Sequence, residues 1–348
     1  MPMRAVVIHA AKDLRVDEVP DGELSAGQVR LRIERGGICG SDLHYYNHGG
    51  FGTVRLREPM VLGHEVAGRV AEVGAGVSAV TVGDLVAVCP SRPDWSDQYS
   101  REGAPNHSLG MQFYGSAMPF PHVQGAFSEQ LVVEAEQCAV VPAHVSAAQA
   151  AMAEPLAVGL HAVRRAGEMI GKRVLVTGCG PIGVLLISAI RRAGAAQIVA
   201  TDLCDEALAF ARRAGADDTV NVATEAERMQ AYEADKGYFH VMFEASGAGQ
   251  ALAHGLRMVR PRGVVLQLGM GGDMTLPVNL ITTKELELRG SFRFNEEFFW
   301  AVEMIAKGLI DVKPVLTHEF SLARAVEAFD MACDRSKAMK VQLDFLAA

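Results

Sequence analysis

The sequence predicts an α/β protein in which a doubly wound parallel sheet is joined to a second, mostly β domain. Short apolar runs separated by glycine and proline fill the first 150 residues, as in a domain of many short strands. From about residue 150, apolar strand patterns alternate with amphipathic helical patterns, which favours a parallel sheet with helices on both faces. A glycine-rich turn follows the first strand of that second region.

The second region is expected to open with a helix over 147–165. Strands and helices should then alternate over 173–177, 181–193, 197–201, 205–214, 240–244, 250–259 and 264–268. A strand over 287–292 and a helix over 296–307 come next. A last strand over 340–344 is expected to rejoin the first domain. The predicted domains are therefore 1–150, 151–287 and a return over 288–348.

Composition limits the kinds of partner. The 348 residues are 49% hydrophobic and 21% charged, and the formal net charge is -8. Nucleic-acid binding needs clustered cations, which this balance does not supply. No apolar run is long enough for a membrane span, and the first residues lack the apolar core of a signal peptide. Six scattered cysteines show no disulfide framework and indicate reduced thiols, so we expect a cytoplasmic protein, with at least one cysteine available as a metal ligand.

A phosphate-binding turn is predicted at Gly178-Cys179-Gly180-Pro181-Ile182-Gly183, which fits G-x-G-x-x-G. Gly178 permits the tight turn, Gly180 lets a pyrophosphate approach the backbone, and Gly183 lets helix and strand pack closely. Asp202 follows about 20 residues later, where an acid accepts hydrogen bonds from a ribose diol. The strand, helix and acid in register predict a Rossmann domain. The same carboxylate repels a 2′-phosphate, which favours NAD over NADP.

Four residues are candidates for a metal site: Cys39, His64, Glu65 and Glu154. Thiolate, imidazole and carboxylate all ligate zinc, and three protein ligands plus an open position make a catalytic site. Each residue also has an ordinary explanation, as a buried thiol or a hydrogen-bonded polar side chain. Their wide spacing in the sequence leaves both interpretations open.

Several segments, spread over essentially the whole chain, resemble the zinc-containing medium-chain dehydrogenase superfamily. They are 36–44, Gly63-His64-Glu65, Gly125-Ala126-Phe127, Ala153-Glu154-Pro155-Leu156 and 178–183. Within it the chain resembles the sorbitol dehydrogenase branch. The stretches 40–46, 48–52 and 115–121 look most like L-idonate 5-dehydrogenases, and Gly290-Ser291-Phe292-Arg293-Phe294 agrees with that branch. The resemblance implies a GroES-like catalytic domain beside the Rossmann domain.

The resemblance also implies the roles of the site residues. Cys39 and His64 would bind a catalytic zinc. Glu65 would be a further ligand, direct or through water, and Glu154 a carboxylate that ligates zinc or exchanges with water. Zinc would act as a Lewis acid on the alcohol while hydride passes to NAD. Ser41 and then His44 would relay the proton to solvent.

One departure from the superfamily concerns its second, structural zinc, which four cysteines hold in a lobe. The matching positions here are Asp94, Asp97, Ser100 and Ser108. Carboxylates and hydroxyls are poor substitutes for a thiolate cage. We therefore expect one catalytic zinc per chain and no structural zinc.

The expected substrate is a sugar acid or a polyol, with L-idonate oxidised to 5-keto-D-gluconate as the first choice. A sugar acid needs a cation for its carboxylate, and Arg55 and Arg293 are the candidates. The alternatives are a sorbitol, xylitol, galactitol or L-threonine dehydrogenase. A non-catalytic NAD-binding structural protein and a zinc-free quinone reductase are less favoured, because the metal-ligand residues are present. The family is dimeric or tetrameric, so a homodimer or homotetramer is expected, with the apolar segment 285–294 as the strand that pairs across a two-fold axis.

Overall fold

The computed structural model describes residues 2–347, which divide into two compact units. Unit 1 contains the chain up to Glu154, Phe298–Asp334 and the chain from Lys340 onward. Unit 2 contains Pro155–Glu297 and Arg335–Met339. Unit 2 thus runs beyond the expected boundary at 287. The reason is that the strand after that point still pairs with the sheet of unit 2, through Leu266↔Arg289.

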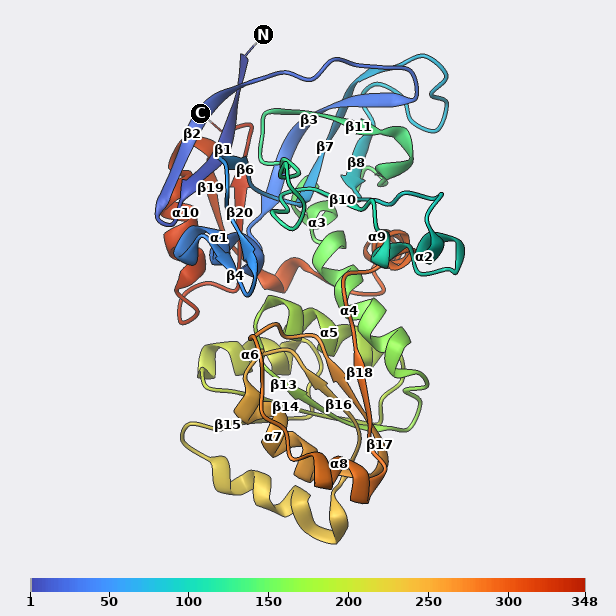
Figure 1. The fold of residues 1–348 in the computed structure, drawn as a ribbon, viewed down its shortest axis with the longest axis vertical. Helices are drawn as coiled ribbons and strands as arrows, with labels where there is room; N and C mark the ends of the chain where they lie inside the picture. Colours follow the sequence, from blue (N-terminus) through green and yellow to red (C-terminus); the bar gives the residue numbers. More distant parts are fainter. Residues whose placement is uncertain (1, 348) are drawn as a thin grey trace. The chain divides into compact units, whose positions relative to one another are not determined.

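Unit 1 is mostly β. Its strands are β1 (Pro2–Ala10), β2 (Asp13–Pro20), β3 (Gln28–Gly37), β4 (Gly50–Phe51), β5 (Val54–Arg55), β6 (Met60–Val61), β7 (Glu65–Val73), β8 (Leu85–Val88), β9 (Ser91–Arg92), β10 (Gln112–Phe113), β11 (Gln130–Glu134), β12 (Cys138–Val140), β19 (Leu316–Ser321) and β20 (Lys340–Asp344). Its helices are α1 (Gly40–His48), α2 (Gln98–Arg101), α3 (Ala147–Ala151), α9 (Glu297–Ala306) and α10 (Ala325–Cys333). Figure 1 follows them along the chain.

The main sheet of unit 1 has the order β12-β8-β7-β3-β20-β19, with β11 also paired to β3. Its central strand β3 alternates as a half-buried strand should: Val29, Leu31 and Ile33 are fully buried, whereas Arg32 is exposed. The tail strand β20 pairs with β3 in this sheet. Residues from the two ends of the chain therefore lie on neighbouring strands.

Unit 2 is a parallel sheet between helices. Its strands are β13 (Arg173–Thr177), β14 (Gln197–Asp202), β15 (Asp218–Asn221), β16 (Phe239–Glu244), β17 (Val259–Gln267) and β18 (Glu287–Gly290). Its helices are α4 (Ala153–Ala166), α5 (Pro181–Arg192), α6 (Asp205–Arg213), α7 (Gly249–Met258) and α8 (Val278–Lys284). The expected single helix over 147–165 is two helices, because α3 ends at a C-cap, Met152, before α4 begins.

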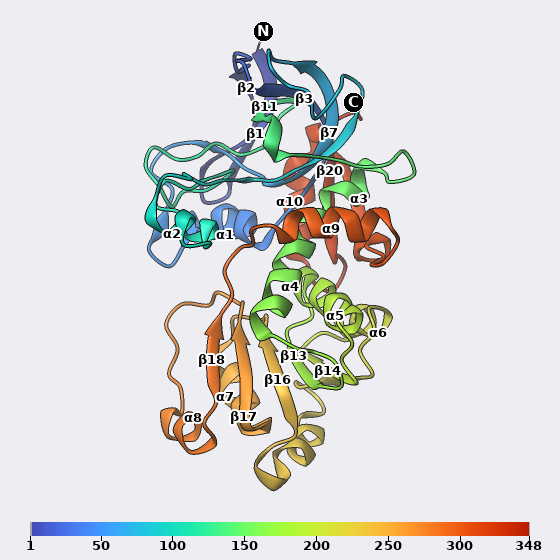
Figure 2. The same ribbon diagram turned by 90° about the vertical axis from the view of Figure 1, so that its right-hand side faces the viewer.

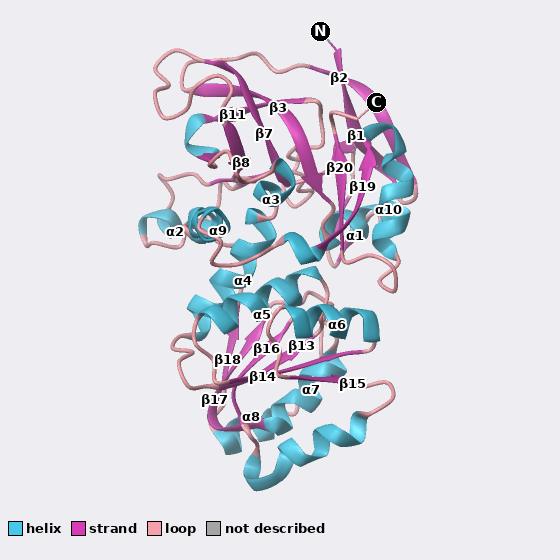
Figure 3. Ribbon diagram, turned by 180° about the vertical axis from the view of Figure 1, so that it is seen from behind, coloured by secondary structure: helices cyan, strands magenta, loops and turns pink. Residues whose placement is uncertain are grey.

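The sheet of unit 2 has the order β15-β14-β13-β16-β17-β18, and all its pairs are parallel. Counted from β13, this is the 3-2-1-4-5-6 order of the doubly wound Rossmann fold. Figures 1 and 3 show α5 and α6 on one face of the sheet, and α7 and α8 on the other. Figure 2 shows β16, β17 and β18 side by side. The predicted fold class is confirmed.

The core on the α7 and α8 face of this sheet is apolar. Phe239 and Met242 of β16 are fully buried and pack with Leu252 and Leu256 of α7. Each large side chain buried in this way stabilises the fold by about 1.5–3 kcal/mol. The sheet is therefore a rigid support for the loops at its carboxyl edge.

Glu297 is a buried carboxylate that should make unit 2 sensitive to acid. It lies 3.1 Å from His161 Nδ1, and it accepts hydrogen bonds from Arg164 Nη1 at 3.0 Å and from the amide of Asn295 at 2.9 Å. Burial alone would raise the pKa of Glu297, but hydrogen bonds from His161 and backbone amides outweigh it and hold the pKa at about 2.

A folded-state pKa below the usual value means that ionised Glu297 stabilises the fold above about pH 4.5, and that this contribution disappears as the pH falls toward 2. Glu297→Gln should therefore lower the free energy of unfolding at pH 7 by up to about 3 kcal/mol. Denaturant unfolding at several pH values checks this, with the exposed neighbour Glu296→Gln as control. The difference from wild type should shrink toward pH 2; a constant difference would contradict the assignment.

The lobe around α2 is held by hydrogen bonds to one carboxylate. Asp97 accepts hydrogen bonds from the Ser100 amide at 2.9 Å, the Ser108 hydroxyl at 2.5 Å and the Leu109 amide at 2.9 Å. The Ser108 hydroxyl in turn accepts from the amide of Asp94 at 2.9 Å. All four positions that correspond to the family's zinc cysteines thus take part in one hydrogen-bonded hub, centred on Asp97.

Asp97→Ala should loosen this lobe, because the side chain is both the N-cap of α2 and the acceptor of the Ser108 hydroxyl. Losing such a cap changes a local opening equilibrium by roughly 3- to 30-fold. Trypsin cleavage after Arg101 should accelerate accordingly. Glu102→Ala, on an exposed residue of the same lobe, is the control. Equal cleavage rates in the two variants would show that Asp97 is not the hub.

Candidate metal centre and cofactor site

Two neighbouring strands of unit 1, β3 and β7, bring the candidate metal ligands together. The antiparallel register pairs Gly37 at the end of β3 with Glu65 at the start of β7. Cys39 lies two residues beyond the end of β3, and His64 lies directly before β7. The ligand atoms of Cys39, His64 and Glu65 consequently all lie within 4.8 Å of one another. Cys39 and His64 are 25 residues apart in the sequence, so their spacing did not predict this proximity. The register of β3 against β7 brings them together.

Cys39 and His64 are further tied together by Asp42, which is fully buried. Cys39 is the N-cap residue of α1, and its amide donates to Asp42 Oδ2 at 3.0 Å. The other oxygen, Asp42 Oδ1, accepts from the amide of Gly63 at 3.2 Å. One carboxylate therefore positions both turns that present the ligands. Its spacing of three residues from Cys39 is a capping-box pattern, so the sequence held a usable signal for it.

His64 carries an unsatisfied nitrogen. The residue is 5% exposed, and among residues 2–347 its Nδ1 has no hydrogen-bond partner. The nearest acid, Asp42 Oδ1, is 3.9 Å away, which is too far for a hydrogen bond. A buried polar atom without a partner costs about 1–3 kcal/mol, so such an atom marks a place for a ligand. A zinc ion fits the thiolate, imidazole and carboxylate donors around it.

Glu65 is ion-paired to a lysine that the sequence analysis missed. Lys340 Nζ lies 2.8 Å from each Glu65 oxygen and 3.1 Å from the carbonyl of Ile38. Both side chains are almost completely buried, at 2% and 0% exposure. A Cβ at Gly37 would stand 2.2 Å from Glu65 Oε2, so glycine is needed there. Lys340 opens β20, 275 residues from Glu65, and no local pattern announces such a pair.

The protonation of this cluster depends on burial and on the charges within it. Burial, followed by the negative charge of Glu65, raises the pKa of the Cys39 thiol to about 12. For Lys340 burial works in the opposite direction, but the charges of Glu65 and Cys39 outweigh it and raise the pKa. Without a metal the thiol is therefore protonated. A divalent cation would favour the thiolate, since metal ligation deprotonates cysteine.

Glu154 lies near this cluster but outside the group of three. It is 5% exposed, and burial raises its pKa well above the usual value. The charge of His64 lowers this pKa, and the charges of Glu65 and Cys39 raise it. Glu154 therefore interacts electrostatically with all three ligand residues.

The two residues expected to relay a proton lie on α1. Ser41 lies close enough to Cys39 for its hydroxyl to lower the pKa of that thiol, against the larger effect of burial. His44, three residues further along the helix, is exposed. Partial burial of the ring and then the neighbouring His48 lower the pKa of His44. Residues three apart lie on the same side of a helix, so the two polar groups follow one face of α1 from the cluster toward solvent.

The two candidate arginines differ in their surroundings. Arg55 is exposed on β5 and donates to the carbonyl of its neighbour Val54 at 3.1 Å. Arg293 is partly buried, lies over the ring of Phe292 at 4.9 Å, and has a positive φ of 55°. The expected strand ends at Gly290, so Arg293 lies in the loop that follows β18.

The glycine-rich turn has the geometry of a phosphate-binding loop. Gly178 has φ +89°, and a Cβ there would stand 2.6 Å from the amide of Ser246. A Cβ at Gly183 would stand 1.9 Å from the carbonyl oxygen of Gly178. Gly180 is the N-cap of α5, with Pro181 and Ile182 in its first turn and no side chain capping the helix. Pro181 has no N–H, so the amides of Ile182 and Gly183 are the donors that a pyrophosphate would meet at this positive helix end.

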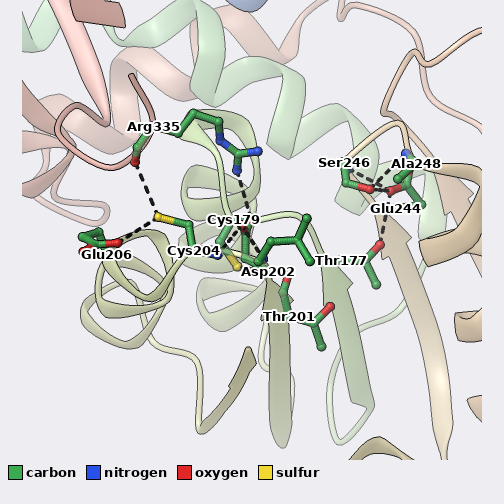
Figure 4. A network of polar contacts seen from close by, with 11 residues as sticks. Thr177, Cys179, Thr201, Asp202, Cys204, Glu206, Glu244, Ser246, Ala248 and Arg335 are labelled. Carbon is green, nitrogen blue, oxygen red and sulfur yellow. Dashed lines mark hydrogen bonds and ion pairs between the residues drawn. The ribbon is translucent and has the colours of Figure 1, made fainter. Parts of the chain in front are cut away.

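Two carboxylates at the carboxyl edge of the sheet hold the loops around this turn (Figure 4). Asp202, at the end of β14, accepts from the amide of Cys179 at 2.7 Å. Glu244, at the end of β16 and fully buried, accepts from the amides of Ser246 and Gly247 at 2.8 and 3.0 Å. The sequence analysis missed Glu244. Its place at the end of a strand beside the glycine turn was the available signal.

A partly buried thiol with a buried imidazole and a buried carboxylate in a β unit, together with a dinucleotide-binding unit, define a metal-dependent dehydrogenase. The comparisons with known proteins agree with that class. Residues 25–143 match the alcohol dehydrogenase GroES-like domain, and residues 181–307 match the zinc-binding dehydrogenase family. The chain belongs to the zinc-binding medium-chain alcohol dehydrogenase family, in the sorbitol dehydrogenase branch. The predicted family is confirmed.

Among its relatives, L-idonate 5-dehydrogenase (NAD(P)(+)) of Escherichia coli K12 is 45% identical over 316 residues, which cover 90% of this chain and 91% of that protein. The sorbitol dehydrogenase of Gallus gallus is 35% identical, with 97% and 95% covered. The crystal structure of the Escherichia coli L-idonate 5-dehydrogenase superposes with a TM-score of 0.95 at 42% identity, over 99% of each chain. Among residues 2–347, no helix is both long and apolar enough to cross a membrane.

Proposed function

We propose that the chain is a zinc-dependent, NAD-linked dehydrogenase that oxidises L-idonate to 5-keto-D-gluconate. The observation that carries the zinc chemistry is the convergence of Cys39, His64 and Glu65, with a buried His64 nitrogen that lacks a partner. The substrate follows from the 45% identity to a relative that bears that name. Zinc, when bound, would polarise the hydroxyl of the substrate as a Lewis acid.

The side chains of the site then have separate roles in binding the zinc and in transferring the proton. Cys39, His64 and Glu65 would hold the zinc. Glu154 would be a further carboxylate that ligates the zinc or exchanges with water. Ser41 would receive the proton of the substrate hydroxyl, and His44 would release it to solvent. Lys340 would hold the Glu65 carboxylate in a fixed orientation through its two 2.8 Å contacts.

We also propose that the chain carries one zinc and that the lobe around α2 carries none. Asp97 and Ser108 satisfy each other there, and neither offers the thiolate that a structural zinc prefers. For the sugar-acid carboxylate, Arg293 is the better candidate, because it is partly buried and stacked on Phe292, whereas Arg55 is exposed.

The free edge of the unit 2 sheet supports a homo-oligomer. β18 is the last strand in the sheet order, and Leu288 on it is 44% exposed. A second copy would cover this edge by pairing with the same strand. The six cysteines, all free, fit a reducing compartment and so support a cytoplasmic location.

The substrate is tested by following NADH formation with zinc-loaded protein and a panel of L-idonate, D-gluconate, D-sorbitol, xylitol, galactitol and L-threonine. The proposal expects kcat/KM for L-idonate to exceed that for every neutral polyol by at least about tenfold, the effect of one charge-assisted contact. Preference for a neutral polyol would keep the dehydrogenase but remove the sugar-acid assignment.

A further inference from the structure

The hydrogen-bonding capacity of Asp202 is already filled. Its Oδ1 accepts from the amides of Leu203 at 2.7 Å and Cys204 at 3.1 Å. Its Oδ2 accepts from the amide of Cys179 at 2.7 Å and from Arg335 Nη2 at 3.0 Å. A carboxylate offers about four acceptor sites. A ribose diol can therefore bind Asp202 only if one of these donors leaves.

Arg335 is the donor that can leave. The other three donors are backbone amides fixed by the turn of the loops, whereas the Arg335 side chain is 58% exposed and the Asp202 side chain 4%. Moving an exposed arginine costs little, because an ion pair that is largely open to water contributes little to stability.

Arg335 lies close both to Asp202 and to the phosphate-binding turn (Figure 4). Its carbonyl oxygen lies 3.7 Å from the sulfur of Cys204, two residues beyond Asp202. Its Nη2 would lie 3.9 Å from a Cβ on Gly180, in the phosphate-binding turn. The guanidinium thus lies between that turn and the acid at the end of β14, which is where the adenosine ribose of a dinucleotide is bound in this fold.

We propose that Arg335 determines the choice of cofactor and enables the chain to use NADP as well as NAD. This inference rests on the cofactor site of the proposed function. With NADP, the guanidinium would neutralise Asp202 and pair with the 2′-phosphate, whose oxygens match its fork of donors. With NAD, it would turn away and leave Asp202 Oδ2 to the ribose diol. Glu206 is also close, 3.0 Å from the sulfur of Cys204, so acidic groups still favour NAD.

The test isolates the 2′-phosphate by comparing the binding of 5′-AMP and 2′,5′-ADP, measured by calorimetry. These nucleotides need neither zinc nor substrate, so the readout is independent of activity. Arg335→Ala should weaken 2′,5′-ADP binding by about tenfold or more, the loss of one charge-assisted phosphate contact. It should not weaken 5′-AMP binding. Arg335→Lys, which keeps the charge, should recover part of the loss.

Arg228→Ala is the matched control, because Arg228 is also a surface arginine of unit 2 paired with a carboxylate, Asp218. It should change neither affinity. Equal losses for both nucleotides in Arg335→Ala, or no loss for either, would overturn the inference, as would a wild-type protein that binds 5′-AMP but not 2′,5′-ADP. Failure of the wild type to bind 5′-AMP would overturn the proposed cofactor site as well, which distinguishes the two failures.

Discussion

Cys39→Ser should remove the metal and lower kcat/KM for the substrate by about a thousandfold or more. The thiolate is the strongest zinc donor of the three clustered residues, and a hydroxyl is a poor replacement. The two remaining donors, His64 and Glu65, do not make a complete zinc site. Metal content by atomic emission and steady-state kinetics, measured on the same sample, check the two parts of the expectation together.

The matched control for this variant is Cys138→Ser. Cys138 is a free, partly exposed cysteine like Cys39, but it lies on β12 and contributes nothing to the metal cluster. It should keep its zinc and its activity. If Cys39→Ser retained a full equivalent of zinc with unchanged kinetics, Cys39 would be no ligand.

Lys340→Met should destabilise the protein by about 3–5 kcal/mol, the usual cost of leaving one member of a buried ion pair without its partner. The Glu65 carboxylate would remain fully buried, with its two 2.8 Å contacts to the ammonium lost. Denaturant unfolding of metal-free protein measures this. Added zinc should restore part of the loss, because the cation would take the place of the ammonium beside the carboxylate.

Two further variants distinguish the effect of breaking the Lys340–Glu65 ion pair from the effect of removing any buried lysine. Lys284→Met removes another buried ammonium, whose partners are carbonyl oxygens, including those of Arg257 and Val259 at 2.6 and 2.9 Å. Lys284→Met should lower the free energy of unfolding by less than Lys340→Met does, because no carboxylate is left without its partner. Combining Lys340→Met with Glu65→Gln should recover stability, because the unpaired charge is gone. Strict additivity of the two substitutions would show that the pair is not coupled.

The sequence was sufficient to predict those parts of the fold and the site that depend on a local pattern of residues. The alternation of strands and helices predicted the doubly wound sheet, and the spacing of Gly178, Gly180 and Gly183 placed the phosphate turn directly after its first strand. The resemblance to a family, rather than spacing, singled out Cys39, His64 and Glu65. The register of β3 against β7 explains why those residues meet.

The sequence was insufficient where partners are distant in the chain. Lys340 reaches Glu65 across 275 residues, and Arg335 reaches Asp202 across 133. Neither lysine nor arginine stands out in its own segment, because both are common surface residues. The lobe around α2 is a similar case: the loss of its cysteines was visible, but the hub formed by Asp97 and Ser108 required the folded chain.

The central claim is that one zinc at Cys39, His64 and Glu65 is responsible for the dehydrogenase activity. The most direct measurement strips the metal with a chelator and titrates zinc back while NADH formation from L-idonate is followed. We expect no activity in the stripped protein, a linear return with added zinc, and a plateau at one zinc per chain. Full activity without metal, or a plateau only after a second equivalent, would contradict the account.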